Sequence, residues 1–135
     1  MATSNRNARY SVELMKKEII SGLSKKARAI GYRKVEAQLQ EAYNFIKMIE
    51  KAPYSQCATV GYLVHEIREV RNKLTARVEQ INSNLPGHQM SLFETTTEFT
   101  LEQERALIEE KCKLEEEIRW LHKCLGMALN PNYFK

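Results

Sequence analysis

Few side chains in this 135-residue sequence have the types and spacing that catalysis or metal binding requires. His65 and Glu66 begin an H-E-x-x-H pattern, but the position of its second histidine holds Glu69, so the zinc-protease helix is incomplete. His122 and Cys124 are two residues apart and point to different sides of a helix, so they cannot share a metal ion without further ligands. All 17 acidic residues are glutamates, which removes the aspartates of serine-protease triads, two-metal nucleases and EF-hands. We therefore expect no enzyme activity, no metal site and no cofactor.

Basic side chains are concentrated in the first part of the chain. Residues 1–51 hold 11 Lys or Arg and 5 Glu, so their net charge is +6, whereas the whole chain carries +4. Such an excess favours a polyanionic partner, because phosphate contacts release counterions and bind without reading bases. A DNA-binding hypothesis assigns these contacts to Lys16, Lys17, Lys25, Lys26, Arg28, Arg33 and Lys34. The alternative for these residues is a solvated helix face.

A short motif lies in residues 82–99, a stretch without helical periodicity. It consists of Gln89, Met90, Ser91, Leu92 and Phe93. Connections between helices in bundles are usually ~2–8 residues long, and longer ones are commonly functional or disordered. A solvated linker does not normally carry three large apolar side chains close together. This stretch is therefore a candidate binding segment.

These five residues resemble the pentapeptide by which bacterial replication and repair proteins bind the β sliding clamp of DNA polymerase III. The family pattern is Gln, an aliphatic residue, Ser or Asp, Leu, and then Phe or Leu, and all five positions agree. The resemblance implies a small adaptor or inhibitor that binds the clamp and so affects DNA replication or repair. It concerns five residues and implies nothing about the fold.

The chemistry of the motif suits docking into a preformed apolar cleft. Leu92 and Phe93 would be the anchors, each worth ~1.5–3 kcal/mol when buried. Met90 would fill an adjoining site with its flexible thioether, and Gln89 would fix the direction of the peptide with its donor and acceptor. The alternative is that Leu92 and Phe93 fold back and pack inside this protein. The sequence leaves both open.

Four helices are expected around this segment, over residues 11–30, 33–51 and 56–82 and from residue 100 to about residue 130. Ser11 is a suitable N-cap for the first helix, Gly31 is placed to end it, and Thr100 with Gln103 forms a capping box for the fourth. The expected apolar stripes, in helix order, are Val12, Met15, Ile19, Leu23 and Ile30; Val35, Leu39, Ala42, Ile46 and Ile49; Val60, Leu63, Ile67, Val70, Leu74, Val78 and Ile81; and Leu107, Leu114, Ile118, Leu121, Leu125 and Ala128.

The pattern predicts an all-α protein, an antiparallel helical bundle or coiled-coil hairpin of about four helices with a long loop at residues 82–99 between the third and fourth. Residues 1–10 are expected to form a flexible basic tail, and residues 11–135 a single domain. Long apolar stripes on more than one helix also predict a homo-oligomer. A structural coiled-coil subunit, in which the pentapeptide is accidental, is a further alternative.

Cysteine content and hydropathy bear on the compartment. Three cysteines, Cys57, Cys112 and Cys124, show no C-x-x-C spacing, so a reduced cytoplasmic protein is expected. Cys112 and Cys124 are expected to act as small apolar residues beside the helix seam. No run of 18 apolar residues occurs, so we expect no membrane-spanning segment.

Overall fold

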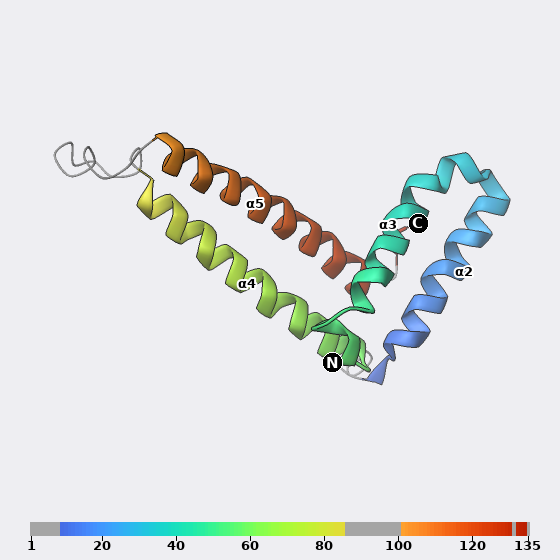
Figure 1. The fold of residues 1–135 in the computed structure, drawn as a ribbon. Helices are drawn as coiled ribbons and strands as arrows, with labels where there is room; N and C mark the ends of the chain where they lie inside the picture. The colour runs from blue at the N-terminus through green and yellow to red at the C-terminus, as the bar shows by residue number, and fades with distance from the viewer. Residues whose placement is uncertain (1–8, 86–100, 131, 135) are drawn as a thin grey trace. The chain divides into compact units, whose positions relative to one another are not determined.

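A computed structural model of the chain describes residues 9–85, 101–130 and 132–134. These residues form four α-helices: α2 (Val12–Ile30), α3 (Tyr32–Ile49), α4 (Val60–Asn84) and α5 (Leu101–Leu129), with a short 3-10 helix, η1 (Tyr54–Gln56), between α3 and α4 (Figure 1). The described residues contain no β-strand, only an isolated antiparallel bridge between Ser11 and Thr59. The all-α class and the four helices predicted from the sequence are confirmed.

Both ends of α2 lie at the residues that the sequence predicts, Ser11 and Gly31. The Ser11 hydroxyl accepts a hydrogen bond of 2.9 Å from the backbone N–H of Leu14, so Ser11 is the N-cap of α2. Gly31 ends α2 with a φ of 102°, and its N–H donates to the carbonyl of Ala27 at 2.8 Å. A positive φ of this size favours glycine because a Cβ would clash with the backbone. Both predicted helix ends are confirmed.

The start of the third predicted helix is wrong by four residues. Gln56 belongs to η1, and α4 begins only at Val60. The reason is a tertiary contact, because the N–H of Val12 donates to Ala58 and the N–H of Val60 donates to Tyr10, which holds the intervening chain in an extended form. The end of this helix is also later than predicted, since α4 continues to Asn84.

The described chain divides into two compact units, which share the continuous helices α4 and α5. Unit 1 comprises residues 1–68 and 123–135, and unit 2 comprises residues 69–122. The prediction of one domain stays a prediction, because two compact units can fold together or separately. Each unit is described by itself below.

The core of unit 1 joins α2, α3, the first part of α4 and the last part of α5. Its fully buried large side chains are Leu23, Val35, Phe45, Val60, Leu63, Ile67 and Cys124. The predicted stripe of α3 is confirmed at four positions, but Ile46 is half-buried and its neighbour Phe45 takes the buried position. Ile30, at the end of the predicted stripe of α2, is 44% exposed.

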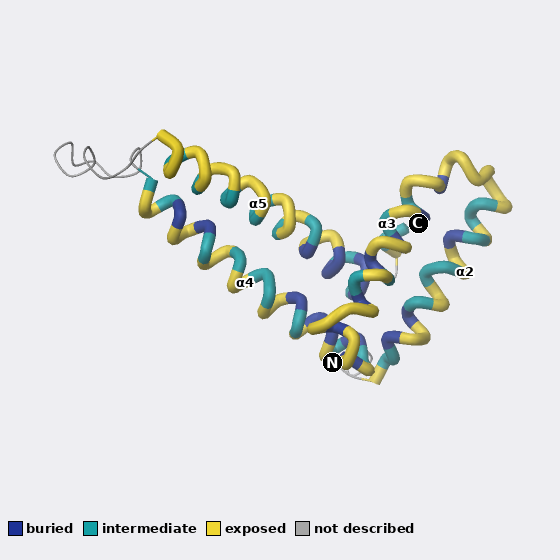
Figure 2. Tube along the Cα trace, viewed as in Figure 1, coloured by how far each residue is buried: buried dark blue, intermediate teal, exposed yellow. Residues whose placement is uncertain are grey.

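Unit 2 pairs residues 69–84 of α4 with residues 101–122 of α5, which run in opposite directions (Figure 1). Its buried hydrophobic residues are Val78, Ile81 and Leu121. Predicted stripe residues such as Leu74, Leu114 and Ile118 are half-buried. In Figure 2 most of the tube along these parts of α4 and α5 is teal or yellow. Cys112 is exposed, so its predicted place beside the seam is wrong, whereas Cys124 is buried in unit 1 as predicted.

Candidate functional site

The predicted partner-binding residues Gln89, Met90, Ser91, Leu92 and Phe93 lie outside the described residues. The structure describes the helices on either side: α4 ends at Asn84 and α5 begins at Leu101. The predicted loop therefore begins later than residue 82, because residues 82–84 continue α4. The Ser83 hydroxyl donates to the carbonyl of Glu79 at 3.0 Å within this last turn. Thr100, the predicted cap of the fourth helix, also lies outside the described residues.

A bidentate ion pair joins the two helices of unit 2 that carry this connection. Arg77 of α4 donates through Nε to one carboxylate oxygen of Glu110 at 2.7 Å, and through Nη2 to the other at 2.9 Å. The hydrogen bond from Arg77 holds the pKa of Glu110 below its ordinary value. Both side chains are more than one-third exposed, so solvent screens the pair and its main effect is geometric registration.

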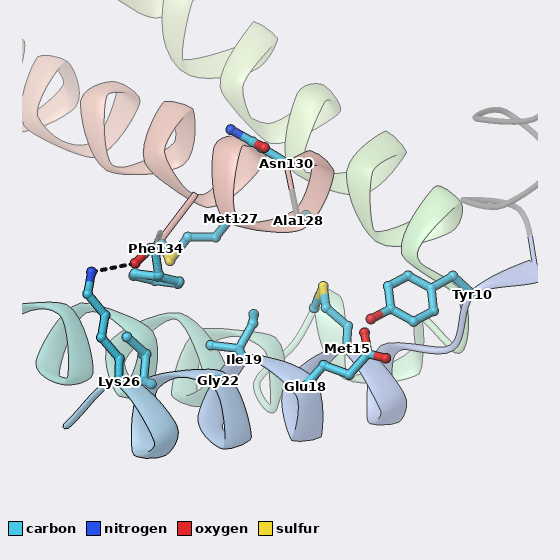
Figure 3. Close-up of a pocket in the computed structure, with 11 residues that line it drawn as sticks. Tyr10, Met15, Glu18, Ile19, Gly22, Lys26, Met127, Ala128, Asn130 and Phe134 are labelled. Atoms are coloured by element: carbon cyan, nitrogen blue, oxygen red, sulfur yellow. Dashed lines mark hydrogen bonds between the residues drawn. The ribbon is translucent and has the colours of Figure 1, made fainter. Parts of the chain in front are cut away.

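The predicted nucleic-acid set lies wholly on α2 and α3 of unit 1, and the structure divides it. Lys16 is largely buried, with its Nζ 2.8 Å from Glu13 and 3.7 Å from Glu50, and the hydrogen bond to Glu13 raises the pKa of Lys16. Lys26 donates to the side-chain oxygen of Gln38 at 3.0 Å and to the carbonyl of Phe134 at 2.7 Å (Figure 3). Because both cations already have partners within unit 1, we exclude them from the residues expected to contact phosphate.

The other five cations, Lys17, Lys25, Arg28, Arg33 and Lys34, are exposed. Within the described residues, none of the five takes part in an ion pair. Four of them flank Gly31, in the last two turns of α2 and the first turn of α3. Tyr32 follows Gly31 directly and is 60% exposed. The sequence signal for Tyr32 was an aromatic residue among cations, but only the structure shows that its ring is free of the core.

A cavity of about 310 Å³ lies in unit 1 between α2 and the chain around the end of α5 (Figure 3). Its apolar wall includes Met15, Ile19, Met127 and Phe134. An added Cβ at Gly22, on the α2 side, would meet nothing within 4 Å. The volume is at the lower end of the ~300–1,000 Å³ typical of small-molecule sites. Sequence reasoning missed this cavity because its two walls are about a hundred residues apart in the chain.

A second polar contact fixes the chain after α5 to α3. The Tyr133 hydroxyl donates to one carboxylate oxygen of Glu41 at 2.9 Å, and Lys123 lies 3.4 Å from the other. Burial, together with the hydrogen bond to Glu41, raises the pKa of Tyr133 to about 12. At neutral pH this phenol therefore stays protonated and acts as a structural donor.

The described residues include cysteine, histidine and glutamate side chains, the types that act as nucleophiles or bind metal ions. Burial raises the pKa of the Cys57 thiol, which makes it a poor nucleophile. In the part of the chain that the structure describes, no three His, Cys or Glu side chains gather closely enough to hold a metal ion. None of the described helices is long and apolar enough to cross a membrane. Comparisons of the chain with known protein families, curated proteins and solved structures found no match.

Proposed function

We propose that this protein is a small non-enzymatic adaptor or inhibitor that binds the bacterial β sliding clamp through Gln89, Met90, Ser91, Leu92 and Phe93. The observation that carries the proposal is the agreement of all five residues with the clamp-binding pattern. Binding there would affect DNA replication or repair, either by bringing this protein to the clamp or by occupying the cleft that a polymerase uses.

The placement of the pentapeptide between α4 and α5 is compatible with docking. Three residues separate Gln89 from Leu85, the last described residue before it, and seven separate Phe93 from Leu101. Fully extended, these stretches reach at most roughly 10 and 25 Å. The chain is therefore long enough to present the motif away from both helix ends.

The motif is connected at both ends to helices, α4 before it and α5 after it. The contact between Arg77 and Glu110 registers α4 against α5 within unit 2. A peptide anchored at both ends loses less conformational entropy on binding than a free tail does. We expect the pentapeptide to gain affinity from this arrangement relative to the same residues in an isolated peptide.

Self-association is part of the proposal. The half-buried stripe of unit 2, which includes Leu74, Leu107 and Leu114, leaves apolar surface that a second copy would cover. A homo-oligomer would present more than one pentapeptide. Because a ring-shaped clamp has repeated clefts, such an oligomer would bind with raised avidity.

The decisive experiment is the double substitution Leu92→Ala/Phe93→Ala, measured against a purified bacterial β clamp by surface plasmon resonance. We expect a loss of at least ~3 kcal/mol, roughly a hundredfold in affinity, because both anchors leave a desolvated cleft. The free energy of unfolding should change by less than ~0.5 kcal/mol. Thr95→Ala/Thr96→Ala, in the same connection but outside the pentapeptide, is the matched control and should bind normally.

The alternative, in which Leu92 and Phe93 pack inside this protein, predicts the opposite result for stability and clamp binding. The double variant would then melt at a lower temperature, and the parent protein would show no clamp affinity to lose. A parent protein that never co-elutes with a bacterial clamp would end the proposal. The two measurements on one variant therefore separate docking from packing.

A further inference from the structure

The turn between α2 and α3 carries an unusual concentration of positive charge. Residues 25–34 contain five Lys or Arg and no carboxylate. Of these five, Lys26 is engaged by Gln38 and by the carbonyl of Phe134. The remaining four are exposed, and together with Tyr32 we call them the hairpin tip: Lys25, Arg28, Arg33, Lys34 and Tyr32.

The charges of the hairpin tip are not compensated within the described structure. Among the described residues, none of its four cations forms an ion pair. Arg33 and Lys34 stand in the first turn of α3, which has no acidic residue and no side-chain cap. Cations are unfavourable there, because the N-terminal end of a helix carries partial positive charge. Arg28 is in the last turn of α2, where the helix dipole favours a cation, so the unfavourable part of the tip is Arg33 and Lys34. A bound anion would relieve that unfavourable interaction.

The exposed ring of Tyr32 indicates which kind of anion the hairpin tip would bind. Tyr32 is 60% exposed and is the first residue of α3, so it lies at the same end of the α2–α3 hairpin as the four cations. Proteins that bind single-stranded nucleic acid without sequence preference combine a basic surface with aromatic rings on which bases stack. In a duplex the bases are paired and stacked on each other, so an isolated tyrosine would have no base to receive.

An anionic membrane fits the hairpin tip less well. Membrane-surface helices insert an apolar face among the lipid headgroups. In α2 and α3 that face is already used, because Leu23, Val35 and Leu39 are buried in the core of unit 1. Only Ile30 and Tyr32 are exposed large apolar residues at the tip.

We propose that the hairpin tip binds single-stranded nucleic acid, with its four cations on backbone phosphates and a base stacked on Tyr32. This site is independent of the pentapeptide, since it lies in unit 1 and uses none of the same residues. The structure changes the sequence-based set in three ways. Lys16 and Lys26 are removed because they are engaged within unit 1, Lys17 is removed because it lies outside the hairpin tip, and Tyr32 is added.

The test uses the full chain and a fluorescently labelled 20-nucleotide oligothymidine, with binding followed by anisotropy from 20 to 200 mM NaCl. Each phosphate contact on a single strand contributes about −0.7 to the slope of log K against log salt. Four contacts predict that Lys25→Gln/Arg28→Gln/Arg33→Gln/Lys34→Gln changes the slope by about 2.8. The variant should remain folded, because it removes like charges that repel each other.

A matched control removes the same number of charges elsewhere in unit 1. Lys17→Gln/Lys47→Gln/Lys51→Gln/Arg68→Gln replaces four exposed cations outside the hairpin tip. If the tip is the site, this control keeps most of the affinity and slope of the parent. An equal loss in both variants would show that only net charge matters, and would overturn the proposal.

Tyr32 supplies the second arm of the test. Tyr32→Ala should weaken binding of the oligothymidine by roughly five- to a hundredfold, as expected for one stacked base, and Tyr32→Phe should bind normally. The proposal would be overturned if Tyr32→Ala bound the oligothymidine as tightly as the parent does and the parent bound a duplex of the same length with equal affinity. So would binding to phosphatidylserine vesicles in the absence of binding to the oligonucleotide. Loss of clamp binding leaves all these outcomes unchanged, so failures of the two proposals are distinguishable.

Discussion

The two units of this chain bury their apolar residues to very different extents. Of the 21 buried hydrophobic residues in the described part of the chain, only Val78, Ile81 and Leu121 belong to unit 2. Unit 1 packs several elements against each other, so each of its helices finds neighbours for its apolar stripe. In unit 2, segments of two helices face each other, and most of their stripe stays half-buried.

Because of this difference, the residues that stabilise the protein are distinct from the residues that we propose bind partners. A core made by several elements covers the apolar stripes of its helices, whereas a seam between two helix segments leaves apolar surface that is only half-buried. The proposed clamp motif follows α4 of unit 2, and the proposed nucleic-acid site is the hairpin tip of unit 1. The two proposed sites can therefore be altered separately.

The largest expected effect comes from truncating matched leucines in the two units. Leu63→Ala in unit 1 should cost about 2–5 kcal/mol, because Leu63 is fully buried and its removal leaves a cavity. Leu114→Ala in unit 2 should cost about 1 kcal/mol, because a half-buried side chain has less area to lose. Urea denaturation followed by circular dichroism measures both. Equal losses would mean that the seam of unit 2 is packed as tightly as the core of unit 1.

Self-association should depend on unit 2. Leu107→Gln/Leu114→Gln places two amides on the half-buried stripe, and we expect it to weaken association by about tenfold or more. Sedimentation equilibrium over a range of concentrations measures the change. Leu14→Gln is the control, because Leu14 is 47% exposed on α2 of unit 1 and lies outside that stripe. A parent protein that is monomeric at high concentration would contradict the predicted oligomer.

The contact between Tyr133 and Glu41 gives unit 1 a pH response in the alkaline range. Tyr133→Phe removes a hydrogen bond to a carboxylate and should cost about 1–2 kcal/mol at neutral pH. The pKa of Tyr133 is raised from 10.0 to about 12, so its stabilising effect is present below pH 10 and is lost as the pH rises toward 12. Denaturation at pH 7, 10 and 11 should show the difference between parent and variant shrinking over that range. Tyr62→Phe, on an exposed tyrosine of α4, should change stability by less than ~0.5 kcal/mol.

Local signals in the sequence predicted the elements well. Ser11 and Gly31 mark the ends of α2 because a hydroxyl cap and a positive φ are properties of single residues. The start of α4 was mispredicted because the bridge from Ser11 to Thr59 is a tertiary contact, which no local pattern reports. The exchange of Ile46 for Phe45 has a similar cause, since neighbours in space decide which of two adjacent apolar residues is buried.

The candidate sites were predictable in part. The cluster of basic residues was visible in the sequence, but its division into largely buried and exposed cations was not fully predictable from it. The nearer partner of Lys16, Glu13, is one helical turn away and is a local pair. The other partners, Glu50 of Lys16 and Gln38 and Phe134 of Lys26, come from other parts of unit 1, and no local pattern reports them. The apolar cavity was invisible for the same reason. The pentapeptide needed no fold to be found, because a linear motif is defined by consecutive residues.

The smallest expected effect concerns the exposed ion pair that registers α4 against α5 in unit 2. Arg77→Gln and Glu110→Gln should each cause a small loss of stability at pH 7, because solvent screens a pair of which more than one-third is exposed. The hydrogen bond from Arg77 lowers the pKa of Glu110, so the contribution of the pair is present above the ordinary pKa of 4.5 and is lost as the pH falls through the lowered value. Double-mutant cycles at a series of pH values from 7 downward, in low salt, measure this coupling.

The expected result is a coupling that is positive at pH 7 and is lost as the pH falls through the lowered pKa of Glu110. High salt should reduce it, since screening weakens charge pairs at the surface. Leu63→Ala, in contrast, should cost the same at both salt concentrations, because its effect comes from packing. A coupling that does not change as the pH is lowered would mean that the residues interact through packing. Unit 2 would then resemble unit 1 more closely than its half-buried stripe indicates.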